Sequence, residues 1–248
     1  MTTSPYSNEP QSRWREITEN LIENYPLTTQ QILDLAMLSW RRLWNFQIGG
    51  KISLEEVELP ATIVGYFFQK LFAHELKSRY PKIWKGEELK TDKDLVNIQN
   101  SNFSTEMKCS GQLGYSLFGN RSYNQVSESS DMSGKNKSGY YITVNFYKKV
   151  ITLLRIGWID QDDWVPQSSA TGQAAVLKPE VYQHKLIEIN GPYRKESPIE
   201  LLDGIGPKSV LQFHGEGVFT FGNLKSYSGD NPKIIKTKND NHQFLNSF

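Results

Sequence analysis

The sequence predicts a mixed α/β (α+β) fold, in which helices flank a central mixed sheet and a small helical appendage follows at the C-terminus. Apolar residues in the first third of the chain recur at helical spacing, in the stripe Leu33, Met37, Trp40 and Trp44. Further along, aromatic and β-branched runs are typical of strands, most clearly at residues 140–147 and 151–159. Helices followed by strands in this order predict a sheet covered by helices.

The composition is that of an ordinary globular protein. The chain has 248 residues, of which 38% are hydrophobic and 22% charged. Its apolar stretches are far shorter than the ~18 residues that a membrane span requires, and its polar N-terminus lacks the apolar core of a signal peptide. The single cysteine, Cys109, excludes an internal disulfide and a cysteine metal cluster. We therefore expect a cytoplasmic protein.

Three helices are expected before the strands begin, at residues 13–25, 28–46 and 59–80. Thr28 followed by Gln31 resembles a capping box at the start of the second helix. The pair Gly49 and Gly50 ends that helical region, and Pro81 stops the third helix.

A β-hairpin is expected next, with arms at residues 94–98 and 103–110. Residues 111–139 are rich in Gly, Ser and Asn and contain too few apolar side chains for a core element. We interpret them as a long functional loop.

Asp94, Glu106 and Lys108 of this hairpin form the candidate catalytic site. Side chains on a strand alternate between faces, so Glu106 and Lys108 point to the same one. Asp94 begins the neighbouring arm and can approach that face from beside them. Two acidic oxygens next to an ammonium group suit Mg²⁺, which prefers oxygen ligands and keeps several waters, so the backbone carbonyl of Met107 completes the expected protein ligands.

Such a site is suited to phosphodiester hydrolysis. A bound Mg²⁺ polarises the scissile phosphate and lowers the pKa of a water. Lys108 then holds or deprotonates that water and offsets the developing charge on phosphorus. A Glu-x-Lys sequence is also common as a surface ion pair, so these three residues alone leave both interpretations open.

Longer segments resemble a known family. The string Asp94-Leu-Val-Asn-Ile, followed by Phe103-Ser-Thr-Glu-Met-Lys-Cys-Ser110, resembles the Asp…(Asp/Glu)-x-Lys core of type II restriction endonucleases of the PD-(D/E)XK superfamily. Accompanying similar segments are 65–70, 118–123, 157–160, Trp164 and 172–173. Together, over about residues 59–190, they are similar to a ScaI-like group of restriction enzymes.

The resemblance implies metal binding by Asp94 and Glu106 and a catalytic role for Lys108. It also implies sequence-specific double-strand cleavage of DNA that leaves 5′-phosphate and 3′-hydroxyl ends. Many members carry a glutamate on the helix before the hairpin, and the matching position here is Gln69. A neutral amide there can still coordinate or position water, or it can be a polar residue on a helix flank. Because a palindromic site is matched by two-fold symmetry, a homodimer is expected.

The loop after the hairpin carries side chains suited to reading DNA. Arginine fits guanine edges bidentately, Asn and Gln fit adenine, and lysines pair with phosphates. The DNA-binding candidates are Asn120, Arg121, Tyr123, Asn124, Gln125, Lys135 and Lys137. Residues 108–155 contain seven basic residues against two acidic ones, although a solvated basic face would look the same.

Two other groups are interpreted as structural. Asp160, Asp162 and Asp163 lie in a turn-like context at a strand end, which favours helix capping over metal binding. Trp158 is expected in the core.

The C-terminal part has a separate character. Residues 201–210, with sequence Leu-Leu-Asp-Gly-Ile-Gly-Pro-Lys-Ser-Val, resemble the hairpin of a helix-hairpin-helix motif. Gly204 and Gly206 permit a tight turn whose exposed amides can bind phosphate, and Lys208 adds charge. A glycine-rich turn between helices is the alternative. The expected catalytic domain covers residues 1–190, and residues 1–58 form its N-terminal helical part. A DNA-backbone-binding segment is expected at 191–224, with a linker at 192–198. Residues 225–248 are expected to be a poorly ordered polar tail.

Two further functions remain open on the sequence alone. A structure-specific DNA repair or recombination nuclease would cleave branched DNA but not linear DNA. A non-catalytic DNA-binding module would bind DNA without magnesium-dependent cleavage and would tolerate Glu106→Gln.

Overall fold

The computed structural model describes residues 3–119, 137–167 and 174–248. Its centre is a six-stranded mixed sheet of order β11-β8-β7-β5-β4-β3. The strands are β3 (Trp84–Gly86), β4 (Leu95–Asn97), β5 (Thr105–Gly111), β7 (Gly139–Tyr147), β8 (Val150–Ile159) and β11 (Leu186–Glu188). β5 runs parallel to β7 and the other neighbours are antiparallel, which confirms the predicted mixed sheet.

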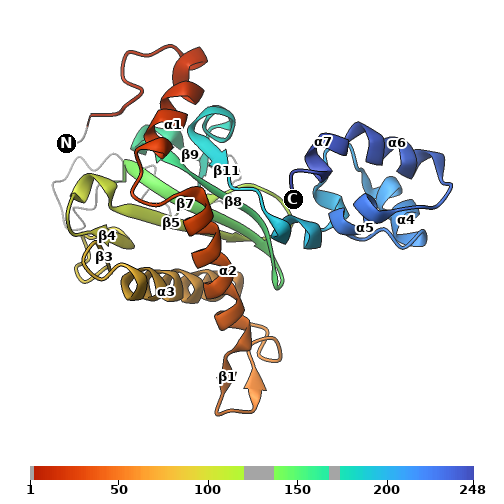
Figure 1. Ribbon diagram of the computed structural model, residues 1–248, viewed down its shortest axis with the longest axis horizontal. Helices are drawn as coiled ribbons and strands as arrows, with labels where there is room; N and C mark the ends of the chain where they lie inside the picture. The colour runs from red at the N-terminus through yellow and green to blue at the C-terminus, as the bar shows by residue number, and fades with distance from the viewer. Residues whose placement is uncertain (1–2, 120–136, 168–173) are drawn as a thin grey trace.

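Three helices cover one face of this sheet, namely α1 (Trp14–Glu23), α2 (Thr29–Asn45) and α3 (Ala61–Arg79) (Figure 1). Alternate residues of β7, from Tyr140 to Phe146, pack with these helices in one buried cluster. Tyr141 points to the opposite face. That face is covered by a small sheet of β6 (Phe118–Gly119), β9 (Trp164–Pro166) and β10 (Ala175–Leu177), which the sequence analysis did not anticipate.

The helix starts follow the sequence signals. Thr28 caps α2, its side chain accepting from the Gln31 amide while the Gln31 side chain accepts from the Thr28 amide, so the expected capping box is confirmed. α3 approaches β5 closely at Gly65, where an added Cβ would stand 2.9 Å from the Cβ of Cys109. The absence of a side chain at residue 65 therefore sets the spacing between this helix and the central sheet.

A two-stranded ribbon of β1 (Gln47–Ile48) and β2 (Ile52–Ser53) stands out from the body beyond the end of α2 (Figure 1). Gly49 and Gly50, expected only to end a helical region, form its turn with φ of 60° and 70°. Positive φ at two consecutive positions is the geometry of a tight hairpin turn, and it favours glycine.

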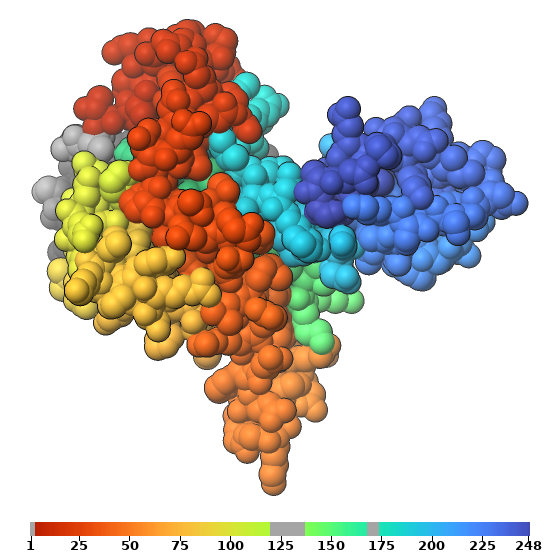
Figure 2. Space-filling view, in the orientation of Figure 1, coloured from red at the N-terminus to blue at the C-terminus, as the bar shows by residue number. Residues whose placement is uncertain are grey.

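The C-terminal helices form a lobe of their own, visible in Figure 2. They are α4 (Pro207–Gly215), α5 (Phe221–Ser226), α6 (Pro232–Asp240) and α7 (His242–Leu245). Ile234 and Leu245 are buried in one cluster with Phe213 and Phe221. The expectation of a poorly ordered tail at 225–248 is therefore wrong: its few apolar residues complete a small core whose other half lies earlier in the chain.

The segment expected as a linker is packed into the body. Residues 192–196 form a 3₁₀ turn in which Tyr193 and Arg194 are buried. Arg194 donates to the carbonyl of Thr152 on β8 at 2.7 Å, and its guanidinium lies over the rings of Phe221 and Phe244 at 5.7 and 5.2 Å. One side chain thus joins the sheet to the C-terminal lobe. Within the described ranges, no helix has the length and apolar character needed to cross a membrane.

Candidate active site

Asp94 and Glu106 meet across the β4–β5 pair. The strands are antiparallel with Leu95 opposite Thr105, so the residue before Leu95 lies opposite the residue after Thr105. The Asp94 carboxylate accepts a hydrogen bond from the Met107 amide at 2.7 Å. This contact ties the half-buried Asp94 to the strand that carries the other two candidate catalytic residues, and the hairpin predicted from the sequence is confirmed.

Glu106 and Lys108 share one face of β5, as strand alternation predicts. The Lys108 ammonium lies 3.3 Å from Oε1 of Glu106. The Glu106 side chain is 5% exposed and that of Lys108 is 19% exposed. A carboxylate this buried is stabilised by an adjacent cation, while the lysine keeps access to the outside.

Gln69 reaches the same strand from α3. Its side-chain amide donates to the carbonyl of Met107 at 3.0 Å. The amide and carbonyl of Met107 are therefore held by two different parts of the chain, by Asp94 before β4 and by Gln69 on α3. This contact fixes the direction of a carbonyl that was expected as a metal ligand.

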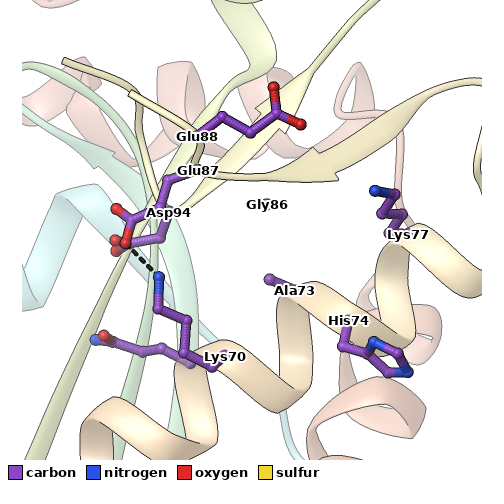
Figure 3. Close-up of a pocket in the computed structure, with 9 residues that line it drawn as sticks. Lys70, Ala73, His74, Lys77, Gly86, Glu87, Glu88 and Asp94 are labelled. Atoms are coloured by element: carbon purple, nitrogen blue, oxygen red, sulfur yellow. Dashed lines mark hydrogen bonds and ion pairs between the residues drawn. The ribbon is translucent and has the colours of Figure 1, made fainter. Parts of the chain in front are cut away.

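A cavity of about 230 Å³ opens beside Asp94 and Gln69. Its remaining lining residues are Lys70, Ala73, His74, Lys77, Gly86, Glu87 and Glu88. Lys70 forms an ion pair with Glu87, which lies beside Asp94 (Figure 3). Lys70 and Glu87 were not predicted from the sequence. Their ion pair is a tertiary contact between α3 and the end of β3, so no local sequence pattern marks it.

Lys137 also belongs to this neighbourhood. Burial and the positive charge of Lys108 together lower the pKa of Lys137. Its carbonyl accepts from the Tyr141 hydroxyl at 2.5 Å, and the next carbonyl, of Ser138, accepts from Lys93 at 2.9 Å. The end of the predicted DNA-reading loop is thus anchored next to the candidate site.

Cys109 is half-buried and faces α3, with its Cβ close to Gly65. Burial raises the pKa of its thiol to about 12; Asp94 raises it further and Lys108 opposes the shift. The thiol therefore stays protonated at neutral pH and packs as a small apolar group.

The donor set is chemically simple. Among residues 3–119, 137–167 and 174–248, no group of three or more His, Cys, Asp or Glu side chains is arranged to hold a metal ion. The candidate site offers two carboxylates and a main-chain carbonyl, all of them oxygen donors, which suits a hard cation that retains water.

The second acidic group is structural. Asp160 and Asp163 form a reciprocal capping box around a 3₁₀ turn at 161–163, which confirms the capping interpretation. The ammonium of Lys185 lies 3.0 Å from Asp160 and 2.9 Å from Asp163. Trp158 is 5% exposed and packs in the main core, as expected.

Six of the residues proposed to contact DNA lie outside the described residues: Asn120, Arg121, Tyr123, Asn124, Gln125 and Lys135. In the C-terminal lobe, Gly204 has a φ of 81° and Gly206 precedes the first turn of α4. Lys208 in that turn is exposed. The element before the turn is only a 3₁₀ helix at Ile199–Leu201, shorter than the first helix of a helix-hairpin-helix.

This chain is similar to known proteins over most of its length. The model of the ScaI restriction endonuclease family matches residues 4–190. The type II restriction enzyme ScaI of Streptomyces caespitosus is 31% identical over 196 residues, which cover 75% of this chain and 85% of that protein. No solved structure matches. The family resemblance expected from the sequence is confirmed: the chain belongs to the ScaI restriction endonuclease family and is a type II restriction endonuclease.

Proposed function

We propose that this restriction endonuclease cuts both strands of duplex DNA by Mg²⁺-dependent hydrolysis at a PD-(D/E)XK-type site formed by Asp94, Glu106 and Lys108. The observation that carries the proposal is the meeting of Asp94 and Glu106 across β4 and β5, with the Lys108 ammonium 3.3 Å from Glu106. Asp94 lines a cavity, and the Lys108 side chain is 19% exposed.

The residues fit a magnesium ion. Asp94, Glu106 and the carbonyl of Met107 would hold it, and all three present oxygen. When bound, the ion supplies Lewis-acid polarisation of the scissile phosphate and lowers the pKa of a coordinated water. Gln69 supports the set indirectly, because its bond to the Met107 carbonyl limits how that ligand can turn.

The protein's own groups then act on the phosphate and the water. Lys108 orients the attacking water and offsets the negative charge that develops on phosphorus. After burial, the positive charge of Lys108 contributes to the lowered pKa of Lys137. Lys137 binds a neighbouring backbone phosphate. In-line attack with departure of the 3′ oxygen yields 5′-phosphate and 3′-hydroxyl ends.

Recognition of the DNA sequence is assigned to the loop that contains Asn120, Arg121, Tyr123, Asn124 and Gln125, with Lys135 on phosphate. The C-terminal lobe binds the DNA phosphate backbone without sequence specificity. The contacts come from the turn amides of Gly204 and Gly206 and from the exposed Lys208. Each chain offers one catalytic site and a duplex has two strands, so the active species is a homodimer.

The test uses long, unmethylated linear duplex DNA of many sequences with Mg²⁺. The wild-type protein is expected to give discrete fragments, and both Lys108→Ala and EDTA to abolish them. Lys82→Ala, at an exposed lysine outside the site, is the matched control and should cut normally. Calorimetry supplies a second readout, in which Glu106→Gln should weaken Mg²⁺ binding. Cleavage that survives Lys108→Ala would overturn the assignment.

A further inference from the structure

Exposed apolar side chains are concentrated in one short stretch of the chain. Thirteen large hydrophobic residues are exposed among those that the structure describes, and seven of them fall within the 22 residues from 46 to 67. We call these seven the finger surface: Phe46, Ile48, Ile52, Val57, Ile63, Tyr66 and Phe67. Exposed apolar residues gathered in this way mark an interaction site, whereas scattered ones need no explanation.

The first part of the finger surface lies on the β1–β2 ribbon, which projects from the body in Figures 1 and 2. Ile48 and Ile52 are directly opposite each other in the ribbon, so both point to the same side of it. Where the chain returns to the body, it is anchored by the buried Leu54 and by an ion pair of Glu55 with Lys149 at 2.5 Å. The ribbon is therefore held in place although its apolar side chains are uncovered.

The second part lies on α3, in the turns that follow the return of the ribbon. Ile63, Tyr66 and Phe67 recur at intervals of three and one, which places them on one face of the helix. The opposite face, with Val64 and Phe68, is buried against the sheet. α3 is thus apolar on both sides, and among the residues that the structure describes only one of these sides is packed against the rest of the chain.

The charges of this region favour a protein as the occupant. Residues 46–67, which carry the finger surface, have one basic and three acidic side chains, Lys51 against Glu55, Glu56 and Glu58. Nucleic acid and anionic membranes select surfaces with a clear basic surplus, which this region lacks. Both signs lie close together, as in Lys51 at the turn and Glu56 shortly after it. A second copy can therefore pair opposite charges around an apolar centre.

We propose that the finger surface is the interface through which two copies of this chain form the dimer. The inference rests on the proposed function, in which each copy cuts one strand, and it identifies the surface that brings the copies together. A stable interface takes about 20–30 residues from each partner, and the seven exposed apolar residues of the finger surface supply the apolar centre of such an interface. α3 also carries Gln69, so contact through its outer face links the interface to the catalytic site in each copy.

The test is sedimentation velocity of the full-length protein over a range of concentrations. One variant combines Ile48→Lys with Ile52→Glu, because opposite charges at facing positions preserve the ribbon. A second, Ile63→Glu, leaves the ribbon untouched and places an acidic residue in the first turn of α3, where the helix dipole tolerates it. The matched control is Leu211→Lys, at a more exposed apolar residue (74%) in the C-terminal lobe.

We expect the wild-type protein and Leu211→Lys to be dimers, and the dissociation constant to rise roughly 100-fold or more in the two finger-surface variants. On a plasmid with one cleavable site, these variants should accumulate nicked circles where the wild-type protein produces linear DNA. Dimers of unchanged affinity in both variants would overturn the proposal, as would a wild-type protein that is monomeric on DNA. Unchanged dimerisation together with loss of DNA binding would indicate that the ribbon binds DNA and not a second copy. Wild-type dimers that never cleave DNA would contradict the proposed function and leave the interface standing.

Discussion

Two clusters in this molecule each join two carboxylates to one lysine, yet their surroundings differ. In the first, Lys108 is 19% exposed, lies 3.3 Å from Glu106, and shares its neighbourhood with a cavity at Asp94. In the second, the Lys185 side chain is 3% exposed and lies within 3.0 Å of both Asp160 and Asp163. Its ammonium also lies over the rings of Tyr6 and Trp14, at 4.3 and 4.5 Å.

The two clusters differ as a structural ion cluster differs from the proposed catalytic one. The carboxylates around Lys185 also cap a turn and accept from Ser4, so their hydrogen-bonding capacity is used within the fold. In the first cluster, Asp94 lines a cavity and the Lys108 side chain is partly exposed. The same three residue types thus stabilise the fold in one place and suit hydrolysis in the other, because access to solvent differs.

The largest expected effect is at the first cluster. Lys108→Ala should lower the rate of DNA cleavage by roughly 10²–10⁴-fold, since it removes the group that handles the water and the developing charge. The melting temperature should fall less than in Lys185→Met, because Lys108 is partly exposed and forms an ion pair with one buried carboxylate. Single-turnover cleavage and thermal denaturation measure the two quantities. A large fall in melting temperature with little loss of cleavage rate would indicate that the first cluster stabilises the fold and does not act in cleavage.

At the second cluster the expected loss is in stability. Lys185→Met should cost about 3–5 kcal/mol of unfolding free energy, because it leaves two buried carboxylates without their cation. Burial already raises the pKa of Asp163, and loss of Lys185 would raise it further. A raised carboxyl pKa contributes stability at low pH that is lost as the pH rises, so the deficit should narrow toward acid pH. Denaturant titrations at pH 5 and pH 8 measure this; cleavage per folded molecule should not change.

Gln69→Leu tests whether the Gln69 side chain orients a proposed metal ligand in the first cluster. The substitution keeps the bulk of the side chain but removes the donor to the Met107 carbonyl. We expect the apparent affinity for Mg²⁺ to fall about 10–100-fold, as for other groups that orient a metal ligand. A magnesium titration of the cleavage rate measures it. A wild-type magnesium dependence would mean that Gln69 is only a polar residue on the helix flank.

The smallest effect is expected at the contact between α3 and β5. Gly65→Ala would place a Cβ 2.9 Å from the Cβ of Cys109, and such overpacking costs about 1–3 kcal/mol. The shift of α3 should also weaken the bond from Gln69 and so raise the Mg²⁺ requirement. Adding Cys109→Gly removes the obstructing atom and should restore the Mg²⁺ requirement in part. A wild-type Mg²⁺ requirement in Gly65→Ala would show that the spacing of α3 is unimportant to the site.

Short-range patterns predicted much of this molecule. The spacing of Glu106 and Lys108 placed both side chains on one face of a strand, and the pairing of that strand with the Asp94 segment followed from the hairpin pattern. Helix starts were predictable for the same reason: a capping box such as Thr28 with Gln31 lies within four residues.

Contacts between distant parts of the chain were not predictable. Lys185 pairs with an aspartate 22 residues away across a turn, and nothing in the local sequence marks it as a partner. The helices at 232–245 looked like a polar tail, because the core that they complete is lined mainly by residues from 199–224. The ribbon at 47–53 was not predicted because its strands have two residues each. Two residues are too few to show the alternation of apolar and polar side chains that is typical of a strand.

The position of Arg194 has a consequence for how this chain could have been assembled. The ScaI family match ends at residue 190, and Arg194 follows directly, hydrogen-bonded to β8 and stacked on aromatic rings of the C-terminal lobe. The lobe has a hydrophobic core of its own. A gene fusion at this joint would therefore need to preserve a short segment in which Tyr193, Arg194 and Ser197 all form hydrogen bonds to β8. Exchange of the lobe after this segment would test whether the lobe contributes to the proposed binding of DNA.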